Sequence, residues 1–211
     1  MTPMKQYYET LAASIIKRLE KRRMEGYYFS TSKEAVEKIL EMMAEGASVS
    51  WGGSATLEQT GMLEALKTSG FETIDRALAK TPAETQECFH KALSADYYFM
   101  STNAITLSGE LVNVDKNGNR AAALVYGPKH VMVLAGMNKV AADTESALKR
   151  IHTCAAPPNA ARLNLSTPCA VTGVCKDCLS DDCICGHTVI TRFNAFPGRI
   201  KVFLIGESLG F

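Results

Sequence analysis

The sequence has no long apolar run and almost no excess of charge of either sign. No window approaches the roughly 20 apolar residues that a helix needs to cross a bilayer, and Met1 to Lys5 lead straight into a charged segment without a signal-peptide pattern. The 23 basic residues are balanced by 22 acidic ones, whereas a dedicated nucleic-acid binder carries a basic excess. We therefore expect a cytoplasmic protein that binds neither nucleic acid nor a membrane.

Cysteine is scarce outside one short segment. Five of the seven cysteines lie between residues 169 and 185, and the other two are Cys88 and Cys154. In a reducing compartment such a cluster is more often metal-binding or catalytic than a disulfide framework. This concentration makes the segment the first candidate for a functional site.

Helical and strand patterns alternate along the first hundred residues, which is typical of βαβ units and a parallel sheet. A capping box at Thr31 and Glu34 and a Thr81-Pro82 start signal mark two of the helices. We expect helices over about 5–23, 32–45, 57–66, 82–93 and 138–153. We expect strands over about 27–29, 47–51, 71–74, 97–100, 110–115, 120–126, 131–135 and 200–205.

The pair Asn117-Gly118 is the strongest short hairpin signal a sequence can carry. It predicts that the strand over 110–115 turns back into a second strand over 120–126. The expected fold class is therefore α/β, with a mostly parallel sheet flanked by helices and an added antiparallel hairpin.

Residues 155–197 interrupt this regular order. They hold four of the seven prolines and five cysteines, with little periodicity. A loop of this length without packing of its own is unusual in a compact domain, so something must order it. We expect one domain over 1–211, with an N-terminal α/β part at 1–50 and a Cys-rich irregular insert at 155–197.

The cysteine spacing is suited to holding a metal. Cys169, Cys175 and Cys178 form C-x5-C-x2-C, and Cys185 extends the series. Two residues between thiolates let a tight turn present both sulfurs to one ion, and four thiolates satisfy an iron–sulfur cluster or, alternatively, tetrahedral zinc. The alternative without metal is a loop of reduced thiols with a redox-active Cys175–Cys178 pair.

Three further groups near this series have less defined roles. Cys183 is a fifth candidate ligand or a spare thiol, and Cys154 could approach the cluster from the end of its helix. His187 follows closely, but a lone histidine is more often a hydrogen-bonded structural residue. We leave these three out of the predicted ligand set.

Two polar turns are expected at the carboxyl ends of strands, where open α/β sheets bind ligands. Gly52, Gly53, Ser54 and Thr56 lie between a strand and a helix, so their amides and hydroxyls could hold a phosphate or carboxylate. The alternative is that the glycines serve tight geometry alone. The second turn is Ser101-Thr102-Asn103, in which Asn103 is a candidate ligand contact.

Glu110 is the only carboxylate in the stretch between the second turn and the start of the hairpin, and it is a candidate catalytic base or nucleophile. An exposed charge at the start of a strand is the other interpretation of this residue.

Several sequence blocks run in order along most of the chain: Asn103-Ala104-Ile105, Gly109-Glu110-Leu111-Val112-Asn113, Gly118-Asn119-Arg120, Gly127-Pro128-Lys129, Ala135-Gly136-Met137-Asn138-Lys139, Ala156-Pro157-Pro158-Asn159, Thr167-Pro168-Cys169 and Gly206-Glu207-Ser208-Leu209-Gly210. Together these blocks resemble the LUD domain, the lactate-utilisation family.

The resemblance implies a fold similar to the ribose-5-phosphate isomerase, glucosamine-6-phosphate deaminase and CoA-transferase group (NagB/RpiA/CoA transferase-like). In that group the turn that matches Gly52 to Thr56 binds ligand anions. The cysteine-bearing branch of the family has arginine where this chain has Cys183. The resemblance thus implies that Cys183 is the extra thiol and that the shared quartet is Cys169, Cys175, Cys178 and Cys185.

The resemblance also implies a function. We expect an accessory or electron-transfer component of L-lactate or related hydroxy-acid oxidation, with a small anionic ligand, an iron–sulfur cluster and redox partner subunits. Assembly into a homo-oligomer is compatible with this role. One alternative is an independent isomerase or CoA-transferase-like enzyme that acts on a sugar phosphate or acyl-CoA through Glu110. Another is a non-catalytic ligand sensor with structural zinc.

Overall fold

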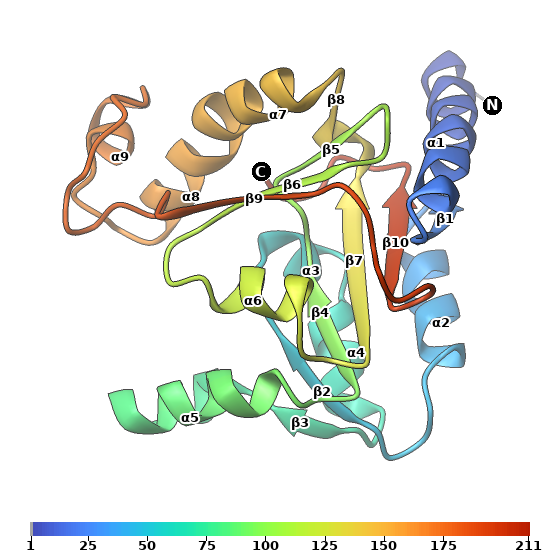
Figure 1. Cartoon of the computed structure of the whole chain (residues 1–211), viewed down its shortest axis with the longest axis horizontal. Helices are drawn as coiled ribbons and strands as arrows, with labels where there is room; N and C mark the ends of the chain where they lie inside the picture. Colours follow the sequence, from blue (N-terminus) through green and yellow to red (C-terminus); the bar gives the residue numbers. More distant parts are fainter. Residues whose placement is uncertain (1) are drawn as a thin grey trace.

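The computed structural model describes residues 2–211, and its central feature is a six-stranded parallel sheet with the strand order β1-β10-β7-β4-β2-β3 (Figure 1). The strands in that order are β1 (Glu25–Phe29), β10 (Ile200–Ile205), β7 (His130–Gly136), β4 (Tyr97–Met100), β2 (Ser48–Trp51) and β3 (Glu72–Ile74). The fold is α/β with a mostly parallel sheet, as the sequence predicts.

A smaller mixed sheet with the order β8-β5-β6-β9 lies beside the first. Its strands are β5 (Ala104–Thr106), β6 (Leu111–Asp115), β8 (Val140–Ala141) and β9 (His187–Thr191). Strands β5 and β6 are antiparallel and consecutive in the chain, so an antiparallel hairpin is present. The other edge of β6 pairs with β9, which belongs to the Cys-rich segment.

Helices cover both faces of the parallel sheet. The first half of the chain supplies α1 (Pro3–Lys21), α2 (Ser32–Glu41), α3 (Ala55–Gln59), α4 (Met62–Thr68), the short 3-10 helix η1 (Arg76–Leu78) and α5 (Pro82–Ala92). The second half supplies α6 (Asn119–Val125), the 3-10 helix η2 (Met137–Lys139), α7 (Thr144–Arg150), α8 (Ala156–Arg162) and α9 (Pro168–Thr172). Within residues 2–211 no helix is both long enough and apolar enough to cross a membrane.

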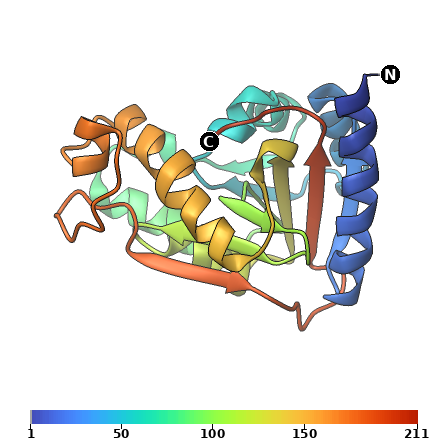
Figure 2. The ribbon, with the colours of Figure 1, turned by 90° about the horizontal axis from the view of Figure 1, so that it is seen from above.

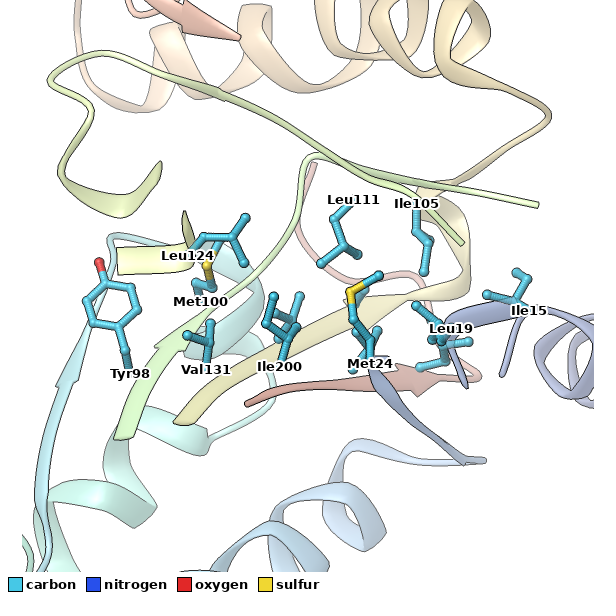
Figure 3. Close-up of a cluster of buried hydrophobic side chains, with 14 of the residues drawn as sticks. Ile15, Leu19, Met24, Tyr98, Met100, Ile105, Leu111, Leu124, Val131 and Ile200 are labelled. Atoms are coloured by element: carbon cyan, nitrogen blue, oxygen red, sulfur yellow. The ribbon is translucent and has the colours of Figure 1, made fainter. Parts of the chain in front are cut away.

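Side chains alternate along the central strands and create two separate cores. On β4, Tyr98 and Met100 belong to one core and lie near Leu124 of α6, at the opposite end of the cluster from Ile15 and Leu19 of α1 (Figure 3). Phe99 belongs to the other core, with buried side chains of α2, α3 and α4. On β10, Phe203 is fully buried in the second core and stacks on Tyr27 with ring centroids 5.1 Å apart. Strands that are buried on both faces explain the nearly continuous apolar runs of β4, β7 and β10.

The helix start signals are confirmed. The Thr31 hydroxyl accepts the Glu34 amide at 3.3 Å, and the Glu34 carboxylate accepts the Thr31 amide at 3.3 Å, which completes the capping box of α2. The Thr81 hydroxyl accepts the Glu84 amide at 3.2 Å and caps α5, with Pro82 in the first turn. In both helices the capping hydroxyl and the amide it accepts lie within four residues, so contacts between neighbouring residues determine where the helix begins.

The predicted return strand over 120–126 is wrong, because those residues form α6. Gly118 adopts the left-handed conformation, with φ of +80°, so the chain does turn there. However, the turn leads into a helix that contains Ala121, Ala122 and Ala123, and alanine is the strongest helix former. The hairpin is instead made by β5 and β6 around the loop 107–110.

The helix predicted over 138–153 begins later than expected. Residues 137–139 form η2, and Asp143 then caps α7, whose first residue is Thr144. A π-helical turn, Ile151–Ala155, joins α7 to α8. Pro157 and Pro158 follow this turn and lack an amide hydrogen, which accounts for the broken register of helical hydrogen bonds.

The Cys-rich segment is more ordered than the sequence predicts. It contains α8, α9 and β9, while residues 173–186 between α9 and β9 hold no regular helix or strand. Figures 1 and 2 place α9 at the opposite end of the molecule from α1. Pairing of β9 with β6 anchors the far end of the segment to the rest of the fold.

Candidate functional site

A cavity of about 230 Å³ opens at the carboxyl ends of the central strands, and we call it the strand-end cavity. Its wall includes residues that follow three strands: the turn after β2, Ser101 to Asn103 after β4, and Lys139 after β7. Residues of the π-helical turn and α8 complete it, consistent with the position of α8 beyond these strand ends in Figure 1. Ligands of open α/β sheets bind at this edge.

Most of the predicted ligand-binding residues meet in this cavity. Gly53, Ser54, Thr56 and Asn103 all line it, although the two turns are far apart in sequence. Gly52 lies just behind the wall, where its amide donates to the Phe99 carbonyl at 3.0 Å. The structure therefore brings the two predicted turns together.

The turn after β2 owes its shape to a capping residue and a close approach. The Ser54 hydroxyl accepts the Leu57 amide at 3.3 Å and thereby caps α3. A Cβ at position 53 would lie 2.5 Å from Nη2 of Arg76, so glycine lets that guanidinium approach the turn. Because α3 is only five residues long, the charge at this site comes chiefly from side chains.

The strand-end cavity is strongly positive. Its basic residues are Arg76, Lys116, Arg120, Lys139 and Arg162. Among the residues 2–211 that the structure describes, the one acidic side chain in the wall is Asp115, and it is already paired with Arg120 at 3.3 Å. A cleft lined by one sign of charge attracts ligands of the opposite sign.

Arg120 organises one wall of the cavity. Its guanidinium donates to the carbonyl oxygens of Ser101 at 3.0 Å and Val114 at 2.7 Å, and to the side-chain oxygens of Asn113 at 2.8 Å and Asn103 at 3.0 Å. The Asn103 oxygen also accepts the Val114 amide at 3.0 Å. Asn103 was predicted as a ligand contact, and in this structure its oxygen orients Arg120.

Lys139 is a buried amine at the wall of the strand-end cavity. It is 3% exposed, and its Nζ donates to the hydroxyls of Thr56 and Ser101, each at 2.8 Å. Burial, followed by repulsion from Arg150 and Arg120, lowers the pKa of Lys139 to about 7. No carboxylate within residues 2–211 forms an ion pair with it.

Glu110 does not line the strand-end cavity. Its carboxylate pairs with Arg22 at 2.8 Å and accepts hydrogen bonds from Thr106 and Ser108, each at 2.7 Å. Burial raises the pKa of Glu110, but the hydrogen bonds and Arg22 outweigh that effect and lower it overall. Its predicted catalytic role remains a prediction, and the geometry assigns it to the junction between α1 and the β5–β6 loop.

The predicted cysteine quartet is held by local contacts. Cys169 is buried in α9 next to the Thr167 hydroxyl at 3.3 Å, and Cys178 lies 3.5 Å from the Ser180 hydroxyl. Cys175 accepts the Asp177 amide at 3.5 Å and lies 3.3 Å from Nδ1 of His152. Amide-to-sulfur hydrogen bonds of this kind are common around metal-bound thiolates.

Cys185 connects the cysteine segment to the strand-end cavity, because it lines that cavity. Burial, followed by the nearby Cys183, Cys175 and Cys169, raises the pKa of the Cys185 thiol to about 12. Cys169, Cys175 and Cys183 thus lie close enough to Cys185 to affect it, whereas Cys178 of the predicted quartet is not among these neighbours. Within residues 2–211, no three His, Cys, Asp or Glu side chains are already arranged to hold a metal ion.

The thiol-rich donor set suits an iron–sulfur cluster or zinc, and the quartet remains a prediction. Cys183 accepts the Cys185 amide at 3.4 Å, which is a supporting contact for a neighbouring ligand. Cys88 lies on α5, and His187 on β9 lies near Gly118.

Four residues of this region lie outside the set predicted from the sequence: Arg76, Arg120, Lys139 and His152. Arg120 and Lys139 stand inside the family-like blocks Gly118-Asn119-Arg120 and Ala135 to Lys139, so a signal for them existed. Arg76 and His152 lie in ordinary helical contexts, and only the fold brings them to the cavity and to Cys175.

A pocket at the carboxyl ends of the strands is where open α/β sheets bind their ligands. The LUD domain profile matches residues 12–205, and the chain belongs to the LUD domain family. No curated protein matches the sequence.

Two solved structures are similar to parts or all of the fold. A DUF162 family protein from Deinococcus radiodurans aligns over 94% of this chain and 98% of its own, with 10% identity and a TM-score of 0.55. The eIF2B delta structure from Chaetomium thermophilum aligns over 62% of this chain and 53% of its own, with 17% identity and a TM-score of 0.37. The first likeness supports the fold alone.

Proposed function

We propose that this protein is an accessory component of the oxidation of L-lactate or a related hydroxy acid, and that it binds a small organic anion in the strand-end cavity. The observation that carries the proposal is the convergence of cationic side chains on a cavity whose one acidic side chain, Asp115, is already paired. Family membership supplies the pathway class.

The size of the cavity favours a small ligand. Pockets for drug-sized molecules occupy about 300–1,000 Å³, and this cavity is about 230 Å³. A hydroxy acid of a few carbon atoms fits that volume, and its carboxylate would face Arg76 and the Gly53–Thr56 turn. A bulky acyl-CoA would have to leave most of its atoms outside.

The cysteine quartet, Cys169, Cys175, Cys178 and Cys185, would hold an iron–sulfur cluster, with zinc as the alternative. When bound, an iron–sulfur cluster supplies one-electron transfer. Because Cys185 lines the strand-end cavity, the cluster would lie beside the ligand. Redox partner subunits would then exchange electrons through the exposed face of this segment, and the isolated chain would show no turnover.

The other functions have less support. An isomerase or CoA-transferase-like enzyme needs a free carboxylate in the cavity. Glu110 is paired with Arg22 outside the cavity, and Asp115 in its wall is paired with Arg120. A ligand sensor with structural zinc uses the same cavity and the same cysteines without electron transfer, and the metal content distinguishes it from the proposed component.

The anion site is tested by replacing Arg76 with methionine. Arg76 forms no ion pair among residues 2–211 and stacks on Phe89 at 5.6 Å, so its removal should leave the fold intact. A charge-assisted hydrogen bond contributes about 1.5–3 kcal/mol, so the Kd for L-lactate or sulfate should rise about tenfold or more. Isothermal titration calorimetry measures this change.

The matched control is Lys149→Met, which removes an exposed cation on α7 that pairs with Glu145 at 2.7 Å. It should bind both anions as the unmodified protein does. Equal affinity in the Arg76→Met variant would move the anion site elsewhere, and the absence of any anion binding would overturn the proposed function.

A further inference from the structure

The buried amine of Lys139 has hydrogen-bond partners but no counter-ion. Lys139 is 3% exposed, and its Nζ lies 2.8 Å from the hydroxyl oxygens of both Thr56 and Ser101. Among residues 2–211 it takes part in no ion pair. A charged ammonium that is taken out of water without a partner is strongly disfavoured.

The hydroxyls of Thr56 and Ser101 can only accept hydrogen bonds from the amine of Lys139, because each donates its own hydrogen elsewhere. The Thr56 hydroxyl donates to the Leu209 carbonyl at 3.4 Å, and the Ser101 hydroxyl donates to the Thr102 carbonyl at 3.3 Å. Each hydroxyl therefore accepts a hydrogen from Lys139. A neutral amine has two hydrogens to give, which these acceptors use completely, whereas an ammonium has a third that needs a further acceptor.

The charges around Lys139 oppose its protonation. Arg120 of α6 and Arg150 of α7 both lower its pKa, in addition to the larger effect of burial, to about 7. Asp115 at the end of β6 is paired with Arg120. The other charged or titratable side chains of the strand-end cavity are Arg76 of η1, Lys116 after β6, Arg162 of α8 and Cys185 of the cysteine segment. Phe211 also lines the cavity. Within residues 2–211, neither its terminal carboxylate nor any of these side chains forms an ion pair with Nζ.

We propose that the carboxylate of the bound ligand is the missing counter-ion of Lys139, so that the anion binds together with one proton taken up at Nζ. This inference rests on the proposed function and adds a specific group and a proton to it. The neutral amine accepts a proton from solvent, and the resulting ammonium directs its third hydrogen to the ligand carboxylate.

The affinity for the anion should depend on pH because the pKa of Lys139 in the free protein is lowered to about 7. Below pH 7 the free protein already carries the proton, so binding takes up little. Above pH 7 the free amine is mostly neutral, and binding must protonate it. The affinity should therefore fall as the pH rises above 7, by up to about tenfold per pH unit, until the pKa of the bound state is reached.

The experiment is calorimetric titration of the full chain with L-lactate, in buffers of different ionisation enthalpy, at pH 6 and pH 8. L-lactate does not titrate in this range, so the buffer dependence counts protons gained by the protein. We expect an uptake close to one proton at pH 8 and close to zero at pH 6. A parallel titration with sulfate shows whether a tetrahedral anion of the phosphate type couples to the same proton.

Two variants test whether Lys139 is the residue that takes up the proton. Lys139→Met should bind L-lactate more weakly and lose the proton uptake at pH 8, whereas Lys149→Met should keep both. Binding of L-lactate by the unmodified protein without proton uptake would overturn this inference and leave the anion site in place. Proton uptake that persists in Lys139→Met would also overturn it. Proton uptake that occurs with sulfate but not with L-lactate would overturn the carboxylate as the counter-ion and indicate an anion of the phosphate type.

Discussion

An Arg120→Met variant is expected to lose about 3 kcal/mol or more of unfolding free energy and most of its affinity for anions. Arg120 satisfies two carbonyl oxygens and two asparagine side chains, and it pairs with Asp115, whose side chain is 13% exposed. Removing one partner of a mostly buried ion pair costs about 3–5 kcal/mol, because the other charge stays behind unpaired. Urea unfolding at pH 7 measures the loss.

Arg162→Met is the matched control for stability. Arg162 lies on the same cavity but is exposed, and within residues 2–211 its guanidinium forms hydrogen bonds only to the side-chain oxygen of Asn159, at 3.0 and 3.2 Å. Its replacement should change the free energy of unfolding by less than about 0.5 kcal/mol. An Arg120→Met variant as stable as this control would contradict the assignment of Arg120 as the organising group of the cavity.

Protein prepared without oxygen is expected to be brown and to contain iron and acid-labile sulfide, and Cys178→Ser should lose most of both. Cys178 is the second thiol of the C-x2-C pair, so its loss leaves the cluster one ligand short. Metal analysis together with the visible absorption spectrum measures this outcome.

Two other cysteine variants complete the test. Cys88→Ser changes a thiol on α5, outside the quartet, and should keep the full iron content. Cys183→Ser should also keep it, because Cys183 is the extra thiol by resemblance to the family. A colourless anaerobic preparation with about one zinc per chain would contradict the iron–sulfur assignment and favour a structural metal.

The parts of the fold that depend on neighbouring residues could be predicted from the sequence. Strands β4 and β10 have the predicted bounds, and the capping box at Thr31 forms as expected. Asn117-Gly118 correctly predicts a turn but not the helix α6 that follows it. The helix propensity of the alanines after it, together with pairing of β6 to β5 and β9, overrode a local hairpin preference.

The candidate site was only partly predictable, since its chemistry depends on contacts between distant segments. Lys139 meets Thr56 across 83 positions and Ser101 across 38. The sequence points to Glu110 as the only carboxylate between the second turn and the start of the hairpin, whereas its partner Arg22 lies 88 positions away at the end of α1. Periodicity and spacing describe one segment at a time, so they cannot supply such pairs.

The most direct test of the account is a crystal structure of the protein with L-lactate or sulfate at saturating concentration. We predict that the anion occupies the strand-end cavity, within hydrogen-bonding distance of the Arg76 guanidinium and of Nζ of Lys139. An anion bound elsewhere, with the strand-end cavity free of it, would contradict the account.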